Sequence, residues 1–357
     1  MKRVLILRPD GIGDFIIFSG VLEEYSKLYG DYEIHLICHP KVRELAETIP
    51  FIGKIICIAT EKVFTKRHPF YTLSSVMKSL VYRYEKAIYP VYSPNSESDF
   101  LMRVARSEEK VAYNGDYSNY NGSIAEREKY YSYLVESQKG QKSELERNLE
   151  FINKLGGKGD LVCVKPKIWF AEGDDIVFEK LSKKWNVKRK RYIAIFPGAG
   201  NKIKCWSAGK WVELISEMLN MGLQDNVVIL GERNDWFIIE RIIGSLNTVY
   251  RRKVVNLYNK TPLRILAKLI GNSRALIASD SGAIHIASAL NVPNICIMGG
   301  GHFGRFYPYG DLTKNRAVYK KLDCFGCNWQ CRYSEPKCIK EINVDDILRE
   351  IKSLVRC

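Results

Sequence analysis

Residues 278–301, ASDSGAIHIASALNVPNICIMGGG, are the stretch that decides the fold of this chain. Apolar residues 275–278 favour a buried strand, which ends in the polar turn Asp280-Ser281-Gly282. Apolar residues then recur at helical spacing from Ala283 until Pro293 ends the helix, and a second apolar run closed by three glycines follows. Such a strand–turn–helix–strand unit is typical of a parallel sheet, whose carboxyl edge and helix N-terminus attract phosphate-bearing ligands.

The rest of the chain repeats this alternation of strand and helix. A first series runs as far as a helix predicted at residues 143–155, and a second series begins with a strand at residues 192–196. The pattern predicts an α/β fold with two doubly wound parallel sheets, separated by a composition break at residues 158–166. The polar, tyrosine-rich residues 116–141 are predicted to form a long loop or mobile helix. The predicted parts are a first domain at 1–165, a second domain at 166–340 and a final helix at 341–357.

Composition narrows the class of protein and of partner. The chain has 357 residues, 46% of them hydrophobic, and a net charge of +15, which indicates an anionic partner: nucleic acid, an acidic membrane surface or a phosphorylated substrate. No apolar run approaches the ~18–20 residues of a membrane span, and the apolar run near the start is too short for a secretion signal. We therefore expect a cytoplasmic protein whose ten cysteines do not form a disulfide scaffold.

The turn after the first predicted strand is RPDGIGD, residues 8–14, and a helix is predicted at residues 15–29. Gly11 and Gly13 allow the backbone to turn tightly after the strand. Asp14 at the start of the helix has two interpretations. It is either the cap of that helix or a general base in a cleft between the domains, where it would accept a proton from an attacking hydroxyl.

A second glycine-bearing turn, PGAGNKIKCW, follows the strand predicted at residues 192–196. Gly198 and Gly200 together with Lys202 and Lys204 would form a pyrophosphate cradle, which combines backbone N–H donors with mobile positive charge. The alternative is an ordinary exposed basic loop. The spacing does not match a Walker loop.

Motifs from both halves of the chain, in the same order, resemble those of one known family. The resemblance rests on Arg8, Ile12-Gly13-Asp14, Lys204-x-Trp206, Asp280-Ser281-Gly282, His285, Ala289-Leu290, Pro293 and the glycines at 299–301. The chain is similar to glycosyltransferase family nine, the ADP-heptose:lipopolysaccharide heptosyltransferases. The resemblance implies the GT-B fold: two Rossmann-like domains facing a central cleft, with the acceptor in the first, the nucleotide sugar in the second and the final helix packing back on the first.

The resemblance also implies a role for each matching residue. Asp14 would be the catalytic base, and Lys204 would neutralise the diphosphate leaving group. Arg8 and Gly13 would lie on the acceptor side. Glu232 would bind the ribose, with a surface carboxylate as the alternative, and a core or capping histidine is the alternative for the donor-binding role of His285. The donor-binding set is Gly198, Gly200, Glu232, Asp280, Ser281, Gly282 and His285.

The reaction implied is a direct displacement at the anomeric carbon. A heptose or related sugar would move from a nucleotide diphosphate sugar, ADP-heptose, to the lipopolysaccharide core or another envelope glycan. The acceptor would be lipid-linked or phosphorylated, and the protein would work at an anionic membrane surface, peripheral to the inner membrane. No cofactor is expected for catalysis, because no Asp-x-Asp pair stands at a strand end to hold a metal.

Four cysteines near the end of the chain form the densest chemical signal: Cys324, Cys327, Cys331 and Cys338. Four thiolates within fifteen residues would suit a tetrahedral structural zinc ion, and the first pair has the spacing of a metal knuckle. Reduced structural thiols, redox or disulfide chemistry and an iron–sulfur cluster are the alternatives.

Two other functions remain alternatives to sugar transfer. A basic zinc-bearing nucleic-acid-binding protein would explain the charge and the cysteines. Its basic residues are dispersed, however, and no recognition helix is evident, so no nucleic-acid partner is expected. A nucleotide-sugar epimerase with the same fold would need a pair of acidic or histidine side chains around the sugar rather than a single base.

Overall fold

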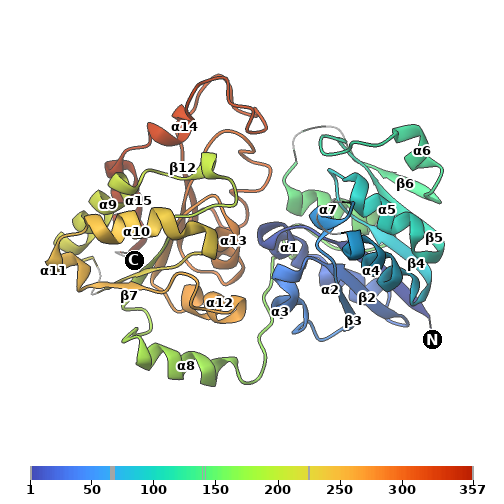
Figure 1. The fold of residues 1–357 in the computed structure, drawn as a ribbon, viewed down its shortest axis with the longest axis horizontal. Helices are drawn as coiled ribbons and strands as arrows, with labels where there is room; N and C mark the ends of the chain where they lie inside the picture. The colour runs from blue at the N-terminus through green and yellow to red at the C-terminus, as the bar shows by residue number, and fades with distance from the viewer. Residues whose placement is uncertain (1, 65–68, 139, 141, 224–225, 356–357) are drawn as a thin grey trace. The chain divides into compact units, whose positions relative to one another are not determined.

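The computed structural model describes residues 2–64, 69–138, 140, 142–223 and 226–355. The chain forms two compact units, Met1–Lys165 and Pro166–Cys357 (Figure 1). Each unit contains one six-stranded sheet in which all strand pairs are parallel. The predicted α/β class with two parallel sheets is therefore confirmed.

The sheet of the first unit has the order β3-β2-β1-β4-β5-β6. Its central strand is continuously apolar, and the side chains from Val4 to Leu7 are all at most 1% exposed, as expected where helices cover both faces of a parallel sheet. The strands are β1 (Arg3–Arg8), β2 (Glu33–Cys38), β3 (Ile52–Cys57), β4 (Arg83–Tyr89), β5 (Arg106–Asn114) and β6 (Tyr133–Glu136).

The helices of the first unit follow the strands in alternation. The single helix predicted at residues 15–29 is two helices, because α1 ends at Ser19 and Gly20, a poor helix former, follows it. The helix predicted at 143–155 is confirmed, and Ser143 caps it with a capping box. The helices are α1 (Ile12–Ser19), α2 (Leu22–Leu28), α3 (Arg43–Ala46), α4 (Pro69–Leu80), α5 (Ser96–Val104), α6 (Ile124–Glu128) and α7 (Glu144–Lys154).

The prediction of a long loop or mobile helix at residues 116–141 is wrong in part. This stretch contains the short helix α6 and the edge strand β6, which pairs with β5 in a register that sets Ala112 opposite Leu134. The strand has only four residues and is surrounded by polar sequence, so its apolar alternation is too brief to be recognised. Residues 139 and 141 lie outside the described residues.

The sheet of the second unit has the order β12-β11-β10-β7-β8-β9. Read from its other edge, this is the same order as in the first unit, and it is the order of dinucleotide-binding doubly wound sheets. The strands are β7 (Tyr192–Phe196), β8 (Asn226–Ile229), β9 (Val254–Asn256), β10 (Ala275–Ser279), β11 (Asn294–Ile297) and β12 (Asn315–Val318). The predicted strand–turn–helix–strand unit at 278–301 is thus confirmed as β10, α13 and β11.

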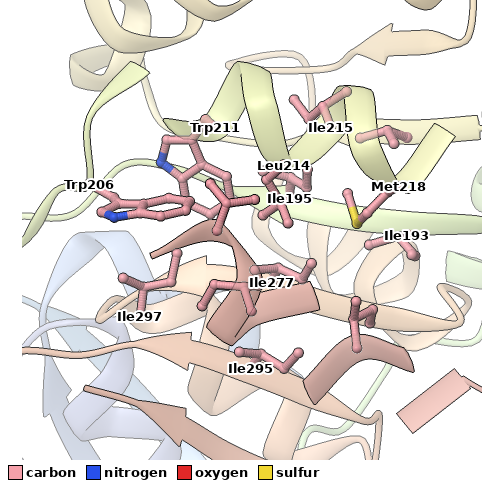
Figure 2. Packing of buried hydrophobic residues seen from close by; sticks show 14 of the residues in the cluster. Ile193, Ile195, Trp206, Trp211, Leu214, Ile215, Met218, Ile277, Ile295 and Ile297 are labelled. Carbon is pink, nitrogen blue, oxygen red and sulfur yellow. The ribbon is translucent and has the colours of Figure 1, made fainter. Parts of the chain in front are cut away.

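The core of the second unit lies between its sheet and the helix after β7. Figure 2 shows Trp206 and Trp211 beside Ile195, and the two indole rings meet edge to face with centroids 5.4 Å apart. The helices are α8 (Asp174–Lys184), α9 (Ala208–Asn220), α10 (Trp236–Ser245), α11 (Thr248–Arg251), α12 (Leu263–Gly271), α13 (Gly282–Ala289), α14 (Lys337–Lys340) and α15 (Val344–Val355), with short 3-10 helices η3 (Lys202–Lys204) and η4 (Arg233–Asp235).

The final helix packs on the second unit, where α15 lies against α9 and strands β10, β11 and β12. Its buried residues Ile347 and Ile351 belong to the same apolar cluster as Ile295 and Ile297. The reason is its apolar stripe, which recurs every three to four residues and covers the face of the second sheet beside α9. The expectation that it packs back on the first domain stays a prediction.

Candidate active site

Both sheets place the predicted site residues at the carboxyl ends of their central strands. In doubly wound sheets ligands bind at this edge, next to the point where the strand order reverses. In the first unit this point lies between β1 and β4, and Arg8, Gly13 and Asp14 stand at the end of β1 or just after it. In the second unit the strand order reverses between β7 and β10. Lys204 follows β7, and Asp280 follows β10.

Arg8 is the buried cation of the first unit's site. Its Nε lies 2.8 Å from the Asp10 carboxylate, and its Nη1 donates to the Pro90 carbonyl at 3.0 Å and to Asn148 Oδ1 at 3.3 Å. The guanidinium also lies over the Phe18 ring, 5.1 Å from its centroid. These contacts hold Arg8 in one position and join the end of β4 and helix α7 to the turn that carries Asp14.

Asp14 lies in the first turn of α1 and is partly buried. Burial raises the pKa of Asp14 to about 7; the Asp10 and Glu144 carboxylates add to the rise and the Arg8 guanidinium opposes it. Gly11 occupies the N-cap position, and Asp14 lies in the first turn, where its carboxylate accepts a backbone hydrogen bond. A carboxyl group with a pKa near neutrality can take up a proton during a reaction, and the general-base role stays a prediction.

In the second unit, Lys204 and Asp280 form an ion pair across the reversal point. The Nζ atom of Lys204 lies 2.8 Å from Asp280 Oδ2, and the Asp280 side chain is almost fully buried. On its other side, Lys204 Nζ lies 4.9 Å from the centroid of the Trp329 ring. Two residues 76 positions apart in sequence are thus brought together at the carboxyl edge of the second sheet.

His285 is buried in the first turn of α13, next to this pair. Its Nδ1 lies 3.1 Å from the Tyr309 hydroxyl, and the two rings stack with centroids 5.7 Å apart. Burial lowers the pKa of His285 to about 4; Asp280 opposes this effect and Lys204 adds to it. The imidazole is consequently neutral at pH 7, and Tyr309 fixes its orientation.

Ser281 and Gly282 form the beginning of α13. Ser281 is the N-cap residue, but its side chain does not cap the helix, and its buried Oγ makes no hydrogen bond to any residue in the described part of the chain. Buried hydroxyls usually have partners. A hydroxyl without one at a helix N-terminus is well placed to donate to an anion.

The three remaining predicted donor residues lie in the turns after β7 and β8. A Cβ atom at Gly198 would come within 2.0 Å of the Asp235 carboxyl group, so only glycine fits there. The backbone N–H of Glu232 donates to Asp235 Oδ2 at 2.8 Å, a hydrogen bond within the turn after β8. A Cβ at Gly200 would meet nothing within 4 Å, and Gly200 lines a cavity of about 810 Å³ together with Trp236 and other residues of α9 and α10.

The cysteine-rich segment does not form the zinc site proposed from the sequence. Over the residues that the structure describes, no group of three or more His, Cys, Asp or Glu side chains could hold a metal ion. Cys331 Sγ instead approaches the Glu335 carbonyl, while a Cβ at Gly299 would lie 3.1 Å from Cys338 Sγ. Burial raises the pKa of the Cys338 thiol, and the thiols of Cys324, Cys327 and Cys331 are near enough to add to the rise.

The cysteine-rich segment also packs against the glycines after β11, a contact that the sequence did not predict. Cβ atoms at Gly300 and Gly301 would lie 2.3 Å from the Phe325 ring and 2.4 Å from the Trp329 ring, so the segment rests directly on the glycines after β11. Trp329 thereby reaches Lys204. The sequence did not predict Tyr309 or Trp329, because neither directly follows a strand or belongs to a short motif. The glycines at 299–301, on which Trp329 packs, were the one sequence signal for Trp329.

The chain matches one protein family and several known proteins. The family model "Glycosyltransferase family 9 (heptosyltransferase)" matches residues 131–331, more than half of the chain. The lipooligosaccharide heptosyltransferase 2 of Haemophilus ducreyi is 23% identical over 99% of this chain and the whole of that relative.

Two solved structures from Escherichia coli have the same fold. The ADP-heptose lps heptosyltransferase II superposes with a TM-score of 0.74 at 19% identity, covering 100% of this chain and 99% of that one. The heptosyltransferase WaaC with ADP-2-deoxy-2-fluoro heptose gives 0.68 at 17% identity, covering 98% and 99%. Taken with the family match, these comparisons show that the chain belongs to glycosyltransferase family 9, the heptosyltransferases, and is a glycosyltransferase of GT-B fold.

Proposed function

We propose that this chain transfers a heptose, or a related sugar, from ADP-heptose to the lipopolysaccharide core or another envelope glycan. The observation that carries the proposal is the Lys204–Asp280 pair beside the N-terminus of α13, with the unpartnered hydroxyl of Ser281. Two of the similar proteins have names that include ADP-heptose or an ADP-heptose analogue. Membership of a glycosyltransferase family favours sugar transfer over the nucleic-acid-binding and epimerase alternatives.

The second unit binds the donor in this proposal. The first backbone N–H groups of α13 and the Ser281 hydroxyl donate to the diphosphate oxygens, which the helix N-terminus also attracts. Lys204 neutralises the diphosphate, and its pairing with Asp280 holds the ammonium group at that edge before the donor binds. Neutral His285 uses the ring nitrogen that does not face Tyr309 to hydrogen-bond the donor. Gly198, Gly200 and Glu232 line the donor side.

Asp14 of the first unit is the base, with Arg8 and Gly13 beside it on the acceptor side. The carboxylate takes the proton of the acceptor hydroxyl while that oxygen attacks the anomeric carbon of the donor sugar. The bond from this carbon to the diphosphate oxygen breaks, and ADP departs with the bonding electron pair. Lys204 and the N-terminus of α13 stabilise its charge. The step as written uses no cofactor.

The acceptor is lipid-linked or phosphorylated in this proposal, and the protein works on the cytoplasmic side at an anionic membrane surface. The net charge of +15 supports this partner, because a surplus of Lys and Arg is attracted to phosphate groups and to anionic lipids.

The experiment is a panel of nucleotide diphosphates and nucleotide sugars, scored by thermal shift and by the mass of products with and without a lipopolysaccharide-core acceptor. ADP and ADP-heptose should stabilise the protein more than the UDP and GDP counterparts, and product should form only with the acceptor. A protein that no nucleotide diphosphate stabilises would refute the proposal.

A further inference from the structure

Helix α4 of the first unit has its apolar side chains on the outside. Phe70, Leu73 and Met77 are 83%, 61% and 58% exposed, and Val81 just after the helix is 63% exposed. Positions three, four and four residues apart lie on one face of a helix, so the four side chains form a continuous apolar stripe. We call this stripe the α4 face.

The opposite side of α4 explains why the stripe is not needed for folding. The buried residues there are Ser75 and Ser79, whose hydroxyls donate to carbonyls one turn earlier in the helix. Tyr71 ties the helix to the turn after β3, because its hydroxyl accepts a hydrogen bond from the Ala59 N–H at 2.6 Å. The helix packs on α5 through this side (Figure 1). It is thus anchored without its apolar stripe, and an exposed stripe of this size marks an interaction surface.

The charge of the surrounding sequence identifies the partner. From Lys62 to Arg83 the chain carries five Lys or Arg and no Asp or Glu. The described basic residues of this segment are all exposed: Lys62 before the helix, Lys78 within it, and Arg83 after it, which pairs with Glu108 at 3.4 Å. Residues 65–68 lie outside the described residues, and the α4 face does not include them. An apolar helical stripe bordered by basic residues fits a surface that offers both negative charge and hydrocarbon, which is an anionic lipid bilayer.

The length of the helix determines how it would bind. A span needs about 20 residues, whereas α4 has 12, and over the described residues no helix is long and apolar enough to cross a membrane. We propose that α4 lies flat on an anionic membrane, inserts the α4 face between the lipids and so docks the first unit at the bilayer. The inference rests on the proposed function in one respect only: a lipid-linked acceptor explains why the enzyme must reach a membrane.

The test is flotation of the full chain with vesicles of phosphatidylglycerol and phosphatidylcholine, compared with vesicles of phosphatidylcholine alone. The variant carries Phe70→Gln, Leu73→Gln and Met77→Gln, which keep a good helix former at three exposed positions. The matched control carries Ile176→Gln and Val177→Gln in α8, which are 75% and 44% exposed in the second unit. Circular dichroism checks that both variants are folded.

We expect the wild-type chain and the α8 control to bind the anionic vesicles equally, and the α4 variant to bind at least tenfold more weakly. Binding should also weaken in phosphatidylcholine alone and at high salt. Absence of wild-type binding, or equal binding by the α4 variant, would overturn the proposal. So would loss of a dimer in the α4 variant with vesicle binding unchanged, since the stripe would then contact a second copy.

The same samples separate this proposal from the proposed function. ADP affinity is measured by calorimetry without lipid or acceptor. A chain that binds ADP but not vesicles would overturn the docking proposal alone, whereas vesicle binding without nucleotide binding would leave docking supported and refute the transfer function.

Discussion

Replacing Asp14 by Asn should make the protein more stable as well as inactive. The folded structure raises the pKa of Asp14 from 3.8 to about 7, so the folded state favours the neutral carboxyl group. Because the pKa of Asp14 is higher in the folded chain than in the unfolded chain, the free energy of unfolding falls as the pH rises from 3.8 to about 7. Above about pH 7 this loss is complete. An asparagine, which is always neutral, avoids this loss.

The size of the effect follows from the shift. A rise of roughly three units corresponds to about 4 kcal/mol at ~1.4 kcal/mol per unit. Because Asp14 retains contact with solvent, we halve this to about 2 kcal/mol at pH 8. At pH 5 the Asp14 carboxyl group of the folded chain is still mostly protonated, so the stabilisation by Asp14→Asn should be less than half of its value at pH 8.

Urea unfolding of the wild-type chain and of Asp14→Asn at pH 5 and pH 8 measures both values. The exposed carboxylate Asp31, replaced by Asn, is the control and should change stability little at either pH. The reasoning is refuted if Asp14→Asn is no more stable than the wild-type chain at pH 8, or if its gain does not depend on pH.

The same variant separates the base from the donor site. Asp14→Asn should lose at least 100-fold in transfer rate, the usual minimum contribution of a general base, and should bind ADP with unchanged affinity. Transfer by the wild-type chain should fall as pH drops below about 7, because the base becomes protonated. A variant with full activity would show that another group takes the proton.

Three other changes test the second unit. Lys204→Ala should weaken ADP binding by about tenfold or more, since it removes the cation nearest Asp280 and leaves that carboxylate unpaired, and calorimetry measures this; equal affinity would exclude Lys204 from the diphosphate site. Trp329→Ala should weaken binding of ADP-heptose while leaving circular dichroism unchanged, because the ring contacts Lys204 from the cysteine-rich segment; unchanged affinity would make Trp329 purely structural. Ile347→Ala should lower the free energy of unfolding by about 2–5 kcal/mol, because its side chain is fully buried between α15 and the second sheet; a loss below 1 kcal/mol in urea unfolding would contradict that placement.

Sequence reasoning worked where a short run of residues determines both a local structure and its chemistry. The Asp280 turn lies between two apolar runs and an apolar helix, so its position at a sheet edge could be predicted. The family resemblance predicted that Lys204 and the Asp280 turn act on the same diphosphate, and the structure brings Lys204 Nζ within 2.8 Å of Asp280 Oδ2.

The features that the sequence did not predict depend on contacts between distant parts of the chain. The position of α15 depends on which sheet leaves a matching apolar face open, and a stripe on one helix does not contain that information. The cysteine spacing resembles a metal knuckle, but over the described residues no group of three or more possible ligands could hold a metal ion, and the segment packs on the glycines after β11. Tyr309 and Trp329 enter the site through such long-range contacts.

The most direct test of the account is hydrogen–deuterium exchange of the full chain with and without ADP-heptose. We predict slower exchange at the backbone N–H groups of residues 281–285 and in the turn at 198–204, because the diphosphate should bind the N-terminus of α13 and Lys204. Protection confined to the cavity beside Trp236, with residues 281–285 unchanged, would contradict the claim that this sheet edge holds the donor.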